Sequence, residues 1–322
     1  MYRSVKRRQL EIALGVLWLI DGMLQFQPYM FGQQFFAGIL GMANMGLPHP
    51  LSSADYRIAG LLVTHPAAWN TVFATLQVVI GMGLLYGRTA RLALLVSVPW
   101  ALGVWVIGEG FGGLFMAGTS LLTGAPGAAL LYGVLAVLLW PEIPPRVLDG
   151  LGQAAWFGVW AGSALLELEP VNHAAGVPGA QITNGGFGQP AWLAWLNRST
   201  GHFIGQGGTA FAVALGAAAV LVGAGVFWPG SRRAAITLGI LLALGVGLLG
   251  QDLGGIATGQ GTDPGTGPLL ILFALVLWPA KSSSVQPAAN VVPTASRRSY
   301  RSDPRPPPVP IGQSVAVTAN NQ

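Results

Sequence analysis

The sequence predicts an all-α, polytopic membrane protein whose eight transmembrane helices form two tandem parallel-repeat four-helix bundles. The first indication is composition: 8% of the residues are charged and 52% are hydrophobic. A soluble domain carries about 25% charged residues. The second indication is an internal repeat, in which one pattern of polar residues and glycines occurs twice. The third is the placement of the basic residues, which follows the rule for membrane topology.

The candidate spans are apolar runs, most of which approach the ~20 residues needed to cross a hydrocarbon core about 30 Å thick. They cover approximately residues 10–28, 68–86, 89–109, 122–140, 151–169, 207–228, 234–252 and 264–279. A transmembrane strand would alternate apolar and polar residues over ~10 positions. The run at 92–106 does not alternate, so we expect helices.

The repeat places matching residues 142 positions apart over its first three segments. The pairs include Trp18 and Trp160, Asp21 and Ser163, Pro28 and Pro170, Gly81 and Gly223, Arg91 and Arg233, and Gly112 and Gly254. After a loop that is four residues shorter, Pro126 and Trp140 match Pro264 and Trp278. Self-similarity at a fixed spacing determines the architecture. We therefore expect an N-terminus (1–9), a first repeat (10–141), a second repeat (151–279) and a tail (281–322).

The basic residues indicate the orientation. Of the 16 lysines and arginines, all except Arg57 and Arg198 fall on one side of the predicted membrane. Because short loops rich in these residues stay in the cytoplasm, we expect a multi-pass protein of the cell inner (plasma) membrane with both termini cytoplasmic. Four spans per repeat make the repeats parallel, with a symmetry axis along the membrane normal. Topology explains the net charge of +5, so we expect the lipid bilayer and no nucleic acid as a partner.

The segments outside the spans are of two kinds. The outer loops at about 29–67 and 171–206 contain apolar pieces, at 35–40 and 191–196, that are too short to span. We expect these pieces to lie flat at the outer interface or to pack over the bundle. The tail at 281–322 is rich in proline, serine and arginine, which predicts a disordered cytoplasmic segment. Its arginines either contact anionic lipid or are simply solvated.

Metal and thiol chemistry are not expected. The chain has no cysteine, which excludes disulfides, thiol catalysis and iron–sulfur ligation by its own residues. All four histidines fall in the outer loops without close ligand spacing: His49, His65, His173 and His202. We therefore predict no metal site, and no cofactor held by this chain alone.

Acids and amides occur inside or at the ends of the apolar runs, in the outer third of the predicted membrane. Asp21 and Gln25 lie one helical turn apart and share a face. Charged groups deep in a bilayer cost roughly 2.5–3.5 kcal/mol, so they normally face a bundle interior or a water-filled cavity. The predicted polar cluster consists of Asp21, Gln25, Glu109, Ser163, Glu167, Gln251 and Asp252. The alternative is that the acids at helix ends are already wet and have no further role.

Two corresponding segments interrupt the pattern before the last span of each repeat. Residues 123–127 and 262–267 contain glycine and proline and precede unusually short apolar runs. Paired interruptions at corresponding positions point to a binding site in repeat-built membrane proteins, because the freed backbone groups line a cavity. The alternative is a plain hairpin turn.

A degenerate motif runs through the first repeat. It comprises Leu14-Gly15, Trp18, Gly22, Pro28, Leu47-Pro48, Gln77, Gly81, Leu84-Leu85, Gly87 and Arg91. Residues 10–110 thereby resemble the DoxX/DoxD-like four-helix membrane proteins, and residues 152–255 resemble them more faintly. The family usually has an acid where Gln77 stands and often a basic residue near Gln25, and this chain departs from both. The resemblance implies a fused duplication and links to membrane redox complexes, including thiosulfate:quinone oxidoreductase.

These observations favour three hypotheses. The first is an accessory subunit of a quinone-linked membrane redox system, with the redox cofactors on a partner subunit. The second is a proton-coupled carrier of a small solute, in which Asp21 and Glu167 bind protons. The third is a non-catalytic scaffold or assembly factor. We do not expect the chain to be an enzyme on its own.

Overall fold

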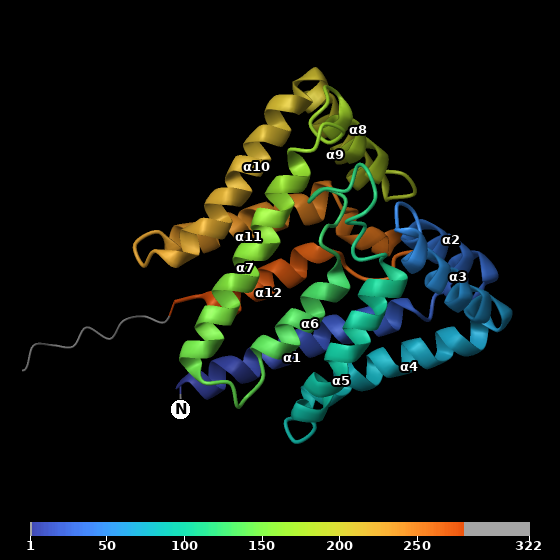
Figure 1. Ribbon diagram of the computed structural model, residues 1–322, viewed down its shortest axis with the longest axis vertical. Coiled ribbons are helices and arrows are strands. Elements are labelled where there is room, and N and C mark those ends of the chain that lie inside the picture. Colours follow the sequence, from blue (N-terminus) through green and yellow to red (C-terminus); the bar gives the residue numbers. More distant parts are fainter. Residues whose placement is uncertain (1, 280–322) are drawn as a thin grey trace, which may run out of the picture. The chain divides into compact units, whose positions relative to one another are not determined.

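The computed structural model describes residues 2–279 (Figure 1). The described residues form helices joined by turns and contain no strand. The predicted all-α class is therefore confirmed for this part of the chain. The tail for which we predicted disorder, 281–322, lies outside the described residues.

The α-helices differ widely in length. Their bounds are α1 (Tyr2–Leu24), α2 (Gln33–Ala43), α3 (His49–Thr64), α4 (Pro66–Leu85), α5 (Ala90–Gly103), α6 (Ala128–Leu138), α7 (Pro145–Glu167), α8 (Val177–Gly185), α9 (Ala191–Ile204), α10 (Gly208–Ala224), α11 (Arg232–Leu249) and α12 (Thr266–Leu277). Short 3-10 or π segments are η1 (Pro28–Phe31), η2 (Val104–Gly108), η3 (Gly205–Gly207), η4 (Gly225–Phe227) and η5 (Asp252–Thr258).

Within the described residues, 4 helical stretches are long and apolar enough to cross a membrane: Pro66–Leu85, Ala90–Gly108, Ala191–Phe227 and Arg232–Thr258. They contain most of the predicted spans at 68–86, 89–109, 207–228 and 234–252, which supports a membrane protein. The helices α1 and α7 are long, at 23 residues each, but contain more charged and polar groups. The helices α6 and α12 have 11 and 12 residues. Neither alone reaches the ~20 residues that a crossing requires.

The helices pack in pairs around a shared core. The pairs are α1 with α4, α5 with α6, α7 with α10 and α11 with α12, and α12 also contacts α1, α6 and α7. In the view of Figure 1, α12 crosses α7 near the middle of the bundle. The largest side chains of the core are Trp156, Trp160, Tyr132 and Phe273, all nearly inaccessible. Glycines permit close approach: a Cβ at Gly81 would lie 2.9 Å from the carbonyl oxygen of Gly15 across the α1–α4 contact.

The short apolar pieces of the outer loops are helices. Residues 35–40 belong to α2, which packs with α3 and η1 around Met30, Phe36 and Leu40. Residues 191–196 belong to α9, which packs on α8 while leaving Trp192 and Trp195 exposed. In Figure 1, α2 and α3 lie beside one end of α4, and α8 and α9 lie at one end of α10.

Candidate functional site

Two turns of unusual backbone conformation lie at the centre of the candidate site. After η2, the φ angles of Gly110, Phe111, Gly112 and Gly113 are 53°, 61°, 67° and 73°. After α11, those of Asp252, Leu253, Gly254 and Gly255 are 51°, 55°, 69° and 66°. Four consecutive left-handed residues are rare, because each non-glycine residue costs roughly 1–2 kcal/mol in this conformation. Backbone strain of this kind is concentrated at functional sites.

Each left-handed turn packs directly against the segment that precedes the next helix. A Cβ at Gly112 would lie 2.0 Å from the carbonyl oxygen of Pro126, and one at Gly254 would lie 1.8 Å from that of Asp263. Both positions therefore require glycine for space as well as for conformation. The interrupted segments at 123–127 and 262–267 thus pack against these turns in a similar way in both halves. Each segment directly precedes or begins a short helix, α6 or α12.

A side chain from each turn caps the following short helix. The Glu109 carboxylate Oε1 accepts a hydrogen bond from the backbone N–H of Ala129 in α6, at 3.0 Å. The Gln251 Oε1 accepts one from the N–H of Thr266 in α12, at 2.7 Å. The first N–H groups of a helix have no partner within the helix and carry partial positive charge. An acid and its uncharged amide counterpart therefore perform the same capping role.

A third side chain joins this arrangement. The Glu167 carboxylate Oε1 accepts a hydrogen bond from the N–H of Leu121, at 3.0 Å, and the Gln251 Nε2 donates to the carbonyl oxygen of Leu121, at 3.2 Å. The segment before α6 is thus held by residues from the second half of the chain. This explains why Glu167, at the end of α7, is almost fully buried without a basic partner among the described ion pairs.

The two turns and the two capping residues line one cavity of about 530 Å³. Its polar lining includes Glu109, Gln251, Asp252 and Asp263, and glycines supply much of the backbone surface. The apolar part of the lining includes Ile39, Met42 and Met116. The volume lies within the range of about 300–1,000 Å³ that small-molecule sites occupy. Apolar contacts and carboxyl groups therefore face the same space.

Close to residues that line this cavity, Asp21 of α1 and Tyr132 of α6 are buried side by side. The Asp21 Oδ1 and the Tyr132 hydroxyl have no other hydrogen-bond partner among the described residues, and they approach each other without a well-aligned hydrogen bond. Glu109 and Asp263, which line the cavity, act electrostatically on both groups.

Asp263 belongs to the loop between η5 and α12. Its carboxylate accepts hydrogen bonds from the Thr262 hydroxyl and from the backbone N–H of Gly265, both at 2.8 Å. The Asp263 carboxylate also lines the cavity.

The structure brings most of the predicted polar cluster together, and it separates one member. Asp21 and Glu109 interact, and Gln251 and Asp252 line the cavity. Gln25 adjoins the same loop as Asp263, with its Nε2 3.5 Å from the carbonyl oxygen of Thr262. Ser163 instead donates to the carbonyl oxygen of Val159 in its own helix, at 2.8 Å.

Sequence reasoning missed two residues of the cluster, Tyr132 and Asp263. Tyr132 lies in an apolar helix and resembles a core aromatic residue, so its sequence context gives no signal. Asp263 lies within the segment 262–267, which we selected for its glycines and proline. An acid directly before that proline is the signal that would have identified it.

Two buried asparagine–aspartate contacts involve the outer helices. The Asn44 Nδ2 donates to the Asp55 carboxylate, joining the end of α2 to α3. The Asn197 Nδ2 donates to the Asp252 carboxylate, joining α9 to the second left-handed turn. Burial raises the pKa of Asp55 above its ordinary value of 3.8, although the Asn44 hydrogen bond lowers it.

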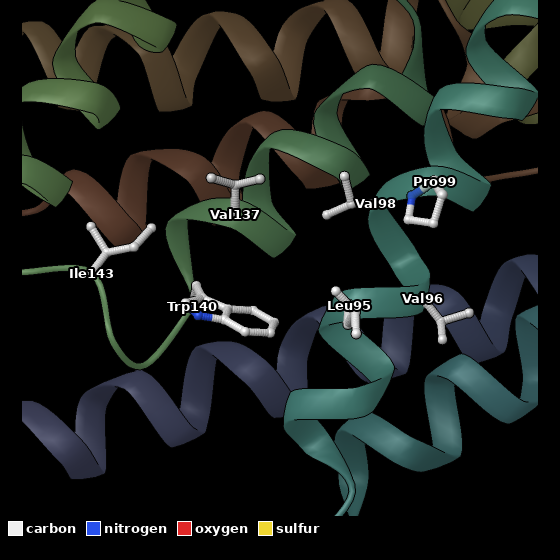
Figure 2. A pocket seen from close by; sticks show the side chains of 7 residues that line it. All are labelled: Leu95, Val96, Val98, Pro99, Val137, Trp140 and Ile143. Carbon is white, nitrogen blue, oxygen red and sulfur yellow. The ribbon is translucent and has the colours of Figure 1, made fainter.

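A second cavity, of about 440 Å³, lies between α5 and α6 near the end of α6 (Figure 2). Its lining consists of Leu95, Val96, Val98, Pro99, Val137, Trp140 and Ile143. Figure 2 shows the Trp140 ring pointing across the groove toward Leu95. These side chains offer apolar contact but no convergent polar groups, which a specific small-molecule site requires. We therefore place the candidate site in the cavity between the two left-handed turns.

Comparison of the chain with family models, with curated proteins and with solved structures gave no match. Within the described residues, no group of three or more histidine, cysteine, aspartate or glutamate side chains could hold a metal ion.

Proposed function

We propose that the chain is an eight-span membrane protein formed by two tandem DoxX/DoxD-like four-helix units. The bounds of the helices support this proposal. Adding 142 to the residue numbers of α4 (Pro66–Leu85) gives 208–227, which α10 and η4 occupy. The same addition takes the first residue of α5, Ala90, to Arg232, the first residue of α11. The φ angles of the two left-handed turns are also closely similar, residue by residue, which further supports a common origin.

In this topology α6 and α12 complete their crossings through the irregular segments before them. Non-helical backbone is tolerated at membrane depth where it lines a cavity or is buried in protein. The segments 119–127 and 259–265 meet that condition, because they pack against the left-handed turns and contribute to the cavity. Both termini then lie on the cytoplasmic side of the inner membrane, as the arginines predict.

We infer further that the cavity binds the headgroup of a quinone, and that the protein is an accessory subunit of a membrane redox system. One observation carries this proposal: the apolar side chains of Met42 and Met116 and the carboxyl groups of Glu109 and Asp263 line the same cavity. A quinone headgroup has flat apolar faces and oxygens that exchange protons when the ring changes oxidation state. Glu109 and Asp263 would bind these oxygens, while the redox cofactors would belong to a partner subunit.

The test is thermal stabilisation of the purified chain in detergent by short-chain quinone and quinol analogues. A ligand that binds only the folded state raises the free energy of unfolding by an amount set by the ratio of its free concentration to its Kd. At a ligand concentration of 100 times Kd, the increase is about 2.7 kcal/mol. We expect stabilisation in the wild type and a much smaller effect in Glu109→Gln. The matched control is Glu142→Gln, because Glu142 is an exposed acid remote from the cavity, with 57% of its side chain accessible. Equal stabilisation in both variants, or none in the wild type, would contradict this proposal.

A second candidate function is a proton-coupled carrier of a small polar solute. The observation that favours it is the start of two short helices, α6 and α12, at one cavity between the two halves. Discontinuous helices of this kind form the substrate site of many transporters. Reconstituted vesicles separate the two functions: a carrier moves solute in response to a pH gradient, whereas a quinone-binding subunit does not. If neither activity is found and Asp21→Asn has no phenotype, the scaffold hypothesis stands instead.

A further inference from the structure

The titratable groups around the cavity are not duplicated, although the surrounding backbone is. Ser163 matches Asp21, Gln251 matches Glu109, and after the shorter loop Leu270 matches Tyr132. Asp263, which comes from the second half, matches Ala125. The capping geometry is retained in both halves, since Gln251 performs the role of Glu109 with an amide. At this capping position the fold therefore needs an acceptor oxygen but not a charge.

The acids gather at one place instead. Asp21 and Tyr132 are buried, at 4% and 2% accessibility, close to Glu109 and Asp263, which line the cavity. The helices packed against α1 add no other ionisable group near Asp21, because α4 and α12 contain none. Every ionisable group that acts on Asp21 is an acid or a phenol. A charge buried without a basic partner is costly, so such groups exchange protons rather than remain ionised together.

Tyr132 is held in place by contacts that leave its hydroxyl free for Asp21. The ring of Trp18 lies 4.2 Å from that of Tyr132, centroid to centroid. The Trp18 indole N–H donates to the Ser97 hydroxyl at 3.0 Å, which fixes the orientation of Trp18. Among the described residues, the buried Tyr132 hydroxyl has no hydrogen-bond partner that would compete with Asp21.

We propose that the Asp21–Tyr132 pair is a proton-binding site that takes up or releases one proton when the charge of the adjacent cavity changes. In the acid form, the proton is bonded to a carboxyl oxygen of Asp21. When that O–H bond breaks, the proton leaves toward the cavity, and the Tyr132 hydroxyl donates a hydrogen bond to the resulting carboxylate. No electron moves in this step. This inference rests on the proposed function in one respect: it takes a quinone or quinol as the ligand that changes the charge of Glu109 or Asp263.

The test measures the carboxylic acid C=O band of Asp21 by infrared spectroscopy as a function of pH, on the full chain without ligand. The band is assigned by its loss in Asp21→Asn and, should that variant fail to fold, in Asp21→Ser, which copies the second half. We expect the midpoint of the Asp21 titration to move by about one pH unit, a tenfold change in proton affinity, in Glu109→Gln. Tyr132→Phe also moves it, because the variant keeps the ring but removes the hydroxyl. Glu142→Gln leaves it unchanged.

Two results would overturn the inference: an Asp21 band that titrates identically in the wild type, Glu109→Gln and Tyr132→Phe, or no band that Asp21 substitution removes. Proton counting separates this failure from that of the proposed function. A quinol analogue added to weakly buffered wild-type protein should exchange about one proton more than it does with Asp21→Asn, if both proposals hold. Coupled titration without any effect of the analogue contradicts only the quinone proposal. Binding of the analogue without coupled titration contradicts only the Asp21–Tyr132 proposal.

Discussion

The equivalence of Glu109 and Gln251 as helix caps gives a quantitative prediction for Glu109. Glu109→Ala removes the acceptor of the Ala129 N–H bond, which is 3.0 Å long and partly buried. Loss of a cap costs roughly 0.5–2 kcal/mol, and an unsatisfied buried N–H costs roughly 1–3 kcal/mol. These two figures describe the same lost bond, so we expect a loss of about 2 kcal/mol. Glu109→Gln keeps an acceptor oxygen at the same position, as Gln251 does, and should cost less than about 0.5 kcal/mol.

The assay is thermal unfolding of both variants in the same detergent. For a chain of this size, 1 kcal/mol shifts the Tm by about 2–4 °C. We therefore expect Glu109→Ala to lower the Tm by about 4–8 °C and Glu109→Gln to leave it nearly unchanged. Gln251→Ala is the matched variant in the second half and should lose at least as much, because Gln251 also bonds Leu121 and the Thr266 hydroxyl. Equal destabilisation by Glu109→Gln and Glu109→Ala would refute the reasoning, because the charge and not the cap would then be what the fold needs.

Two further predictions concern the left-handed turn and Asp55. Gly254→Ala should prevent folding or lower the Tm severely, since its Cβ would meet the Asp263 carbonyl at 1.8 Å and its φ is 69°; Gly245→Ala, where a Cβ meets nothing within 4 Å, should be neutral or stabilising by up to about 1 kcal/mol. The raised pKa of Asp55 means that the folded state binds its proton more tightly than the unfolded state does. The resulting contribution to the free energy of unfolding is fully present below pH 3.8 and is lost as pH rises through the pKa of the folded state. Asp55→Asn should therefore remove the contribution of Asp55 to the pH dependence of the Tm and raise the Tm at pH 7. The measurement is thermal unfolding of both proteins over a range of pH, and an unchanged profile of Tm against pH would contradict the prediction.

Hydropathy and helical length predicted the all-α class and located the four long apolar helices, because both are properties of local sequence. The interruptions at 123–127 and 262–267 indicated short apolar runs, but hydropathy could not predict the bounds of α6 and α12, which have 11 and 12 residues. The left-handed turns fix where these helices begin, and that constraint comes from packing between each turn and the segment that precedes the next helix. The glycines at 112 and 254 were visible in the sequence, but their steric role needs the carbonyls of Pro126 and Asp263.

The candidate site was predictable only in part for a related reason. Asp21 and Glu109 could be proposed because an acid in an apolar run needs a polar environment. Asp263 joins them from a distance of more than 150 residues in sequence, which periodicity cannot reveal. Ser163 was included by analogy with Asp21, yet a buried serine can satisfy its hydroxyl on its own helix, and Ser163 does so through Val159. Matching positions in a repeat thus indicate matching backbone, while the chemistry of each copy depends on its own neighbours.

The central claim is that the two halves cross the membrane in the same direction. The chain has no cysteine, so single cysteines can be introduced at matching exposed positions and labelled with a membrane-impermeant reagent in intact cells and in inverted vesicles. The positions are Arg88 and Gly230 at one end of the bundle, and Met45 and Phe187 at the other. We predict that cysteines at 88 and 230 react only from the cytoplasmic side, and that those at 45 and 187 react only from the outer side. Labelling of either matched pair from opposite sides of the membrane would contradict the account.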